Sequence, residues 1–168
     1  MKERAILPLV LTMSLPMVLS MLVSSLYNIV DSYFVAKISE DAMTALSLVF
    51  PVQNFINAVT IGFSIGVNAV ISYFLGAQEQ EKANSAASQG LLLSAIHGVI
   101  LTVGCIAAMP AFLRMFTDDE LVISLGLRYS NIAFAFAVVI ALGMCFEKIY
   151  QAVGKMTVAM VCVLSGCI

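Results

Sequence analysis

Long stretches without a charged side chain dominate this sequence, and they leave few folds open to it. The first runs from residue 5 to residue 30 and the second from residue 42 to residue 78. At about 1.5 Å per residue, a helix of about 20 residues already crosses the roughly 30 Å hydrocarbon core of a bilayer. Since 61% of the residues are apolar and only 11% are charged, against about 25% charged in soluble domains, we expect an all-α polytopic membrane bundle.

The charged residues between these stretches predict where the helices end. They indicate four full transmembrane helices and the start of a fifth, because the apolar stretch after Lys155 reaches only Ile168 and a span needs about 20 residues. The predicted helices cover residues 5–36, 46–75, 84–112, 121–146 and 156–168. We therefore expect the chain, residues 1–168, to be a truncated part of a larger bundle.

The basic residues predict a cytoplasmic N-terminus, since inner loops of membrane proteins carry an excess of Lys and Arg. With this orientation five of the eight basic residues lie inside and three lie outside or near the outer face. The inner ones are Lys2, Arg4, Lys82, Lys148 and Lys155, and the outer ones are Lys37, Arg114 and Arg128.

Asp31 lies near the end of the first predicted helix, where an ionised side chain is energetically unfavourable. A carboxylate at the centre of such a helix costs about 2.5–3.5 kcal/mol, and less near an interface. Ser24 and Asn28 precede it at helical spacings and share its face. Hydroxyl, amide and carboxylate oxygens suit Na⁺, and the carboxylate can instead take up a proton. We predict that Asp31, Asn28 and Ser24 form a cation- or proton-coupling site; the alternative is that Asp31 merely ends the helix at the interface.

A row of amides and hydroxyls recurs along one face of the second predicted helix. Such groups do not face lipid, so they either hydrogen-bond to a neighbouring helix or line a wet passage for a substrate, and the sequence leaves both open. The candidate substrate-cavity residues are Tyr27, Gln53, Asn54, Asn57, Ser64 and Asn68. His97, alone in the middle of the third helix, is expected to make a packing hydrogen bond or, as the alternative, to relay protons.

Several other classes of function are disfavoured. The chain has no HExxH motif, no pair of intramembrane Asp residues and no Ser/His arrangement around His97, so we do not expect an enzyme. Its cysteines, Cys105, Cys145, Cys162 and Cys167, lack metal or redox spacing. We expect no cofactor and no metal beyond a possible Na⁺ at Asp31. With a net charge of −2 and no basic cluster, we expect no nucleic-acid partner.

Two segments in particular resemble a known family. They are Leu26-Tyr27-Asn28-Ile29-Val30-Asp31 and Ala45-Leu46-Ser47-Leu48-Val49-Phe50-Pro51. An early proline, Pro16, a Gly62–Asn68 segment and the Gly76-Ala77 link agree as well. Over residues 5–168 the chain resembles the multidrug and toxic compound extrusion (MATE) family of secondary transporters.

This resemblance implies two six-helix lobes around a central cavity and export of organic, often cationic compounds in exchange for Na⁺ or H⁺. Asp31 would be the acidic residue of the N-terminal lobe, to which the chain would belong as its truncated form. The implied location is a bacterial inner membrane. The implied partners are a small-molecule substrate, membrane lipid and the missing C-terminal lobe, either from the same longer chain or from another copy.

Two further functions stay open. A lipid-precursor flippase of a related superfamily also needs a polar cavity, although with more cationic groups for pyrophosphate than Arg128 alone provides. A non-transporting membrane remnant or interaction module is the other alternative.

Overall fold

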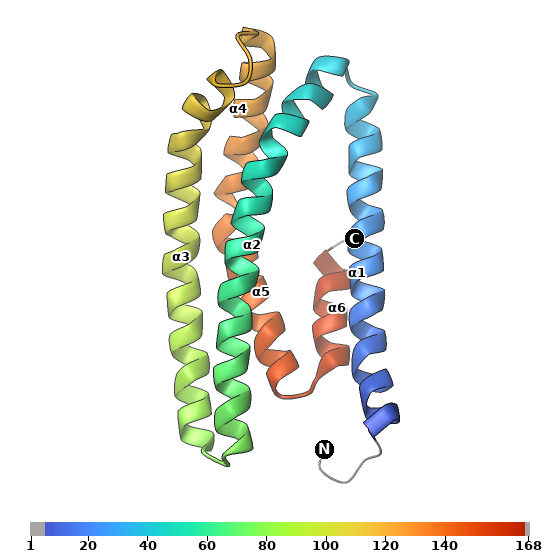
Figure 1. Ribbon diagram of the computed structural model, residues 1–168, viewed down its shortest axis with the longest axis vertical. Coiled ribbons are helices and arrows are strands. Elements are labelled where there is room, and N and C mark those ends of the chain that lie inside the picture. The colour runs from blue at the N-terminus through green and yellow to red at the C-terminus, as the bar shows by residue number, and fades with distance from the viewer. Residues whose placement is uncertain (1–5, 167–168) are drawn as a thin grey trace.

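The computed structural model describes residues 6–166, and six helices make up nearly all of this range (Figure 1). The first and last residues of the predicted helices 5–36 and 156–168 lie outside the described residues. In chain order the helices are α1 (Ile6–Ala36), α2 (Glu40–Gly76), α3 (Gln80–Arg114), α4 (Glu120–Ala135), α5 (Ala137–Ala152) and α6 (Met156–Gly166).

The helices fit a polytopic membrane protein. Three of them, α1, α2 and α3, are individually long and apolar enough to cross a bilayer. A fourth span results if α4 and α5, which bend by 42° at Phe136, are counted together. The described part of α6 has 11 residues, fewer than the roughly 20 that a span needs.

Helix α2 begins at Glu40 and not at the predicted residue 46. The hydroxyl of Ser39 accepts a hydrogen bond from the Ala42 N–H at 3.0 Å and caps the helix. Glu40 and Asp41 lie in the first turn, where the helix dipole favours acidic groups. Helix α3 also begins before the predicted residue 84, at Gln80, and Glu81 lies in its first turn. Both predicted starts were too late because the prediction left charged residues out of the helices. The two helices in fact include charged residues that precede the apolar stretch.

The predicted helix 121–146 is too short at its C-terminal end. The chain continues as α5 to Ala152, so Lys148 lies in a helix and not in an inner link. Its ammonium is 3.2 Å from the carboxylate of Glu147, and this neutralisation lets both charges stay in the helix. Gly154, with a φ of 76° that glycine adopts without strain, then reverses the chain into α6.

The core lies between α2, α3, α4 and α5. Val49, Met109, Leu113 and Phe134 are fully or almost fully buried there. Helix α1 stands apart from this core: it meets α2 near their shared link and diverges from it along the rest of its length (Figure 1). Helix α6 lies beside α1 and contacts both α1 and α5.

Glycines set the closest approach between helices of the core. A Cβ built on Gly98 of α3 would lie 2.8 Å from the Cα of Val138 in α5. One built on Gly90 would lie 2.6 Å from Cγ1 of Val67 in α2. In contrast, added Cβ atoms on Gly62 and Gly66 of α2 meet nothing within 4 Å. The tight contacts of α3 with α2 and α5 therefore depend on Gly90 and Gly98.

We expect Gly98→Ala to destabilise the fold by about 1–3 kcal/mol, the usual cost of overpacking, because the backbone of α5 would have to move. Gly104→Ala, on the same helix, is the matched control: its Cβ meets nothing within 4 Å, and the change removes a helix-disfavouring glycine. Unfolding by sodium dodecyl sulfate, followed by circular dichroism, checks both variants. Equal midpoints for the two variants would contradict the close packing of α3 on α5.

Candidate functional site

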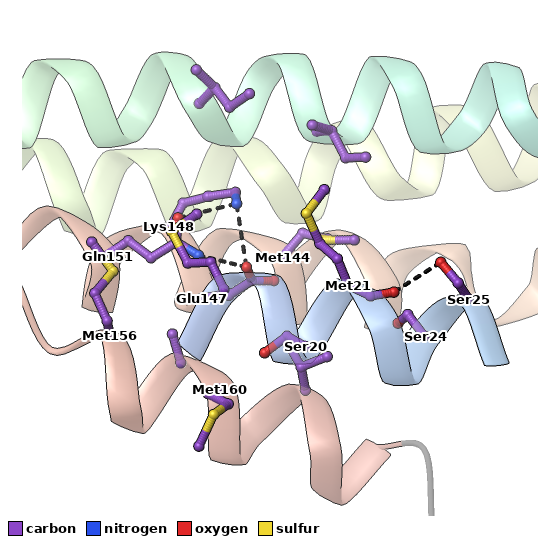
Figure 2. Close-up of a pocket in the computed structure, with 15 residues that line it drawn as sticks. Ser20, Met21, Ser24, Ser25, Met144, Glu147, Lys148, Gln151, Met156 and Met160 are labelled. Carbon is purple, nitrogen blue, oxygen red and sulfur yellow. Dashed lines mark hydrogen bonds and ion pairs between the residues drawn. The ribbon is translucent and has the colours of Figure 1, made fainter. Parts of the chain in front are cut away.

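A cavity of about 500 Å³ lies between α1, α2, α5 and α6, where α1 diverges from the core (Figure 1). Its volume falls within the roughly 300–1,000 Å³ typical of small-molecule sites. Most of its wall is apolar, and thioethers from three helices contribute much of it (Figure 2). These methionines are Met17 and Met21 of α1, Met144 of α5, and Met156 and Met160 of α6.

Two of the three serines of α1 that line the cavity donate to carbonyls of their own helix. Ser20 donates its hydroxyl proton to the carbonyl of Pro16 at 3.0 Å, and Ser25 donates to that of Met21 at 2.9 Å. Such bonds to the preceding turn satisfy a hydroxyl inside an apolar helix. The α1 wall of the cavity therefore offers mainly apolar contacts to a ligand.

The charged part of the wall comes from the last turns of α5. One carboxylate oxygen of Glu147 accepts from Lys148 Nζ at 3.2 Å and from Gln151 Nε2 at 2.6 Å, while Lys148 also donates to Gln151 Oε1 at 3.1 Å (Figure 2). The side chains of Lys148 and Glu147 are only 15% and 17% exposed. Asn68 of α2 donates to the backbone carbonyl of Lys148 at 2.7 Å and fastens α5 to α2.

Sequence reasoning missed this network because it took the charges for a link between helices. A signal was nevertheless present. Glu147 and Gln151 are four residues apart and so share one helix face, and the adjacent Lys148 can neutralise the acid.

Asp31 lies on the α1 face that lines the cavity, two turns beyond Ser24 and about 10 Å further along the helix. It is exposed in this chain. Tyr129 of α4 lies near Gln53 of α2, and the charge of Asp31 acts on its hydroxyl. Helices α1, α2 and α4 therefore each bring a polar group to this region.

The expected contacts within the Asp31 stripe are not seen. Asn28 donates its amide proton to the Ser24 carbonyl at 2.8 Å, and not to the carboxylate. Among residues 6–166, the ion pairs are Lys82–Glu79, Arg114–Glu120 and Lys148–Glu147, and Asp31 belongs to none of them. Backbone carbonyls one turn earlier compete successfully for the polar side chains of an isolated helix face. The coupling role of Asp31, Asn28 and Ser24 stays a prediction.

The predicted substrate-cavity residues do not line this cavity. Gln53 is half-buried. Asn68 binds the backbone of α5, which for Asn68 agrees with the interhelical alternative. Asn54 is exposed and Asn57 is half-buried. Of the two predicted groups together, Ser24 alone lines the described cavity. The assignment of the others to a substrate passage stays a prediction.

Ser64 faces a different part of the molecule. With Thr60 and Ser94 it forms a set of buried hydroxyls that have no hydrogen-bond partner in the described part of the chain. They surround a void between α2, α3 and α5 that is too small for a water molecule. His97 borders the same void, and its ring centroid is 5.4 Å from that of Phe63. The expected packing hydrogen bond of His97 is absent from the interactions seen here.

Comparison with known proteins adds independent information. The chain is 26% identical over 166 residues to the multidrug export protein MepA of Staphylococcus haemolyticus, which covers 98% of this chain and 37% of MepA. It is 28% identical over 103 residues to an FAD transporter of Shewanella oneidensis, covering 61% of this chain and 23% of that protein.

The fold agrees with that of a solved transporter. The outward-facing structure of a multidrug resistance MATE family transporter matches with a TM-score of 0.90 and 28% identity, over 95% of this chain and 35% of the other. The chain therefore spans 37% of MepA and 35% of this solved chain. The MatE family model matches residues 16–168, and the chain belongs to this family of transporters.

Proposed function

We propose that this chain forms part of an ion-coupled exporter of amphipathic organic compounds, and that the methionine-lined cavity binds the compound. The observation that carries the proposal is the position of this cavity on the same face of α1 as Asp31. The names of the relatives, a multidrug export protein and a multidrug resistance transporter, support the same function.

The composition of the cavity wall suits ligands of varied shape. Methionine side chains are unbranched and polarizable, and they adapt to different apolar surfaces. The charged and amide side chains are gathered at one end, around Glu147. A ligand with an apolar body and one polar group matches this arrangement.

Asp31 is proposed as the group that takes up the coupling ion. An ionised carboxylate is costly within a bilayer, and Na⁺ or a proton removes that cost. Moving one elementary charge through 100 mV supplies about 2.3 kcal/mol, so one or two ions per cycle support a useful concentration gradient. With the N-terminus inside, as the basic residues predict, Asp31 lies toward the outer end of α1 and the Glu147 network toward the inner end.

The charge pairing in the cavity favours an exporter over a lipid-precursor flippase. A pyrophosphate needs free cationic groups, whereas Lys148, which is the basic residue among the described lining residues, is already paired with Glu147.

We expect Ile65→Trp to weaken ligand binding at least about tenfold, equivalent to about 1.4 kcal/mol, because Ile65 lines the cavity and the indole would fill it. Binding of radiolabelled tetraphenylphosphonium to the chain in lipid nanodiscs measures this effect. Val99→Trp is the control, since Val99 is 51% exposed and lies outside the cavity. Equal loss in both variants, or in neither, would contradict ligand binding at this site.

We expect dicyclohexylcarbodiimide to modify Asp31 faster than Asp118 in nanodiscs, because the reagent attacks protonated carboxyl groups in apolar surroundings. Mass spectrometry of peptides measures both rates, and Asp31→Asn serves as the blank. Protection by Na⁺ but not by K⁺ identifies Na⁺ as the coupling ion, and equal rates in both salts identify the proton. If Asp31 reacts no faster than the exposed Asp118, the coupling role is excluded.

A further inference from the structure

We propose that Glu147 binds the cationic group of the ligand, and that Lys148 occupies this position when the cavity is empty. The inference deepens the proposed function, because it rests on the same cavity being the ligand site. It predicts an exchange of one cation for another on a single carboxylate.

Glu147 is the acidic residue among the described residues that line the cavity. Its carboxylate is held from two sides, by Gln151 Nε2 at 2.6 Å and by Lys148 Nζ at 3.2 Å (Figure 2). Because Gln151 holds the carboxylate through its own N–H, Glu147 keeps one partner when Lys148 leaves it. A positioned carboxylate in largely apolar surroundings attracts a cation strongly.

Lys148 is the member of the pair that can move. Its ammonium is carried by a flexible four-carbon stem, whereas the carboxylate of Glu147 is on a shorter one. Lys148 also lies near the end of α5, which stops at Ala152, and long basic side chains near helix ends extend toward the water interface. The ammonium additionally contacts Gln151 Oε1 at 3.1 Å, a partner that it can keep after leaving the acid.

The same geometry disfavours an anionic ligand. An anion bound to Lys148 would lie beside Glu147, because the two side chains are in contact. The short acidic side chain cannot withdraw, so the two negative charges would repel each other. A monocation with an apolar body fits both the acid and the methionines.

This exchange has a distinctive signature, because neutralising the two members of the ion pair changes cation affinity in opposite directions. Glu147→Gln removes the group that binds the ligand and should weaken binding of tetraphenylphosphonium about tenfold. Lys148→Gln removes the competitor and should strengthen it several-fold. A structural role of the ion pair predicts instead that both variants weaken binding.

The experiment measures equilibrium binding of radiolabelled tetraphenylphosphonium to the 168-residue chain in nanodiscs, for both variants and for Glu147→Gln combined with Lys148→Gln. The gain from Lys148→Gln should largely disappear in the Glu147→Gln background, since no carboxylate is left to compete for. Binding of neutral triphenylphosphine oxide should be the same in all four proteins. Lys148→Arg, which keeps an internal cation, should strengthen probe binding less than Lys148→Gln does.

A second measurement needs no variant and so does not depend on the folding of one. An amine-reactive acetylating reagent, followed by mass spectrometry, should modify Lys148 faster when tetraphenylphosphonium is present, because the ammonium has left the carboxylate. Lys82, which pairs with Glu79 far from the cavity, should react at the same rate with and without the probe.

Slower or unchanged reaction of Lys148, or a shift of affinity in the same direction for both neutralised residues, overturns the exchange. If Ile65→Trp still weakens binding in that case, the cavity remains supported as the ligand site although the exchange fails. If the unchanged chain binds no tetraphenylphosphonium, the cavity proposal fails together with the exchange.

Discussion

The close packing of α2, α3 and α5 determines where everything else in this chain can lie. Gly98 brings the backbones of α3 and α5 together, and Asn68 ties α2 to α5 through the Lys148 carbonyl. Within a bilayer, small residues and interhelical hydrogen bonds of this kind hold helices together, because lipid is as apolar as the side chains. Helix α1 lies outside that core, and the cavity lies between α1 and α5.

Charge neutralisation explains how the same sequence keeps acids within helices of a membrane protein. Glu147 and Lys148 neutralise each other, and this allows α5 to continue to Ala152. Breaking such a pair is costly because it leaves one charge uncompensated in apolar surroundings. Asp31 belongs to no ion pair among the described residues, so its charge has to be balanced by something other than those side chains.

Much of the architecture follows from the sequence alone. The charge-free stretches predict α1, α2 and α3 because helices are the structures that satisfy the backbone within lipid. Their starts were less predictable, since a cap such as Ser39 extends a helix beyond the apolar stretch. No proline or glycine at Phe136 predicts the bend there. The two bent helices, α4 and α5, pack against α2 and α3.

The site was harder to predict than the fold. Helical spacing predicts that Ser24 and Asp31 share one face, but spacing does not say which partner a polar group selects. Asn28 bonds a carbonyl of its own helix, and Asn68 bonds one on α5. The cavity is lined by methionines that are far apart in the sequence. From the sequence alone, each of them is indistinguishable from a methionine that packs against a neighbouring helix.

The two acids near this cavity differ in how their charge is balanced, and this difference fits the separate roles proposed for them. Glu147 already carries an internal ammonium and a bound amide, so any further cation must displace a group that is tethered to the same helix. Such a site responds to the size and charge of an organic ligand, because the apolar wall next to it contributes to binding. Asp31 belongs to no ion pair among the described residues, so a small ion could bind there and leave without displacing a basic side chain. The proposed exporter would therefore load an organic cation at Glu147 and a coupling ion at Asp31, at separate places on one helix-lined surface.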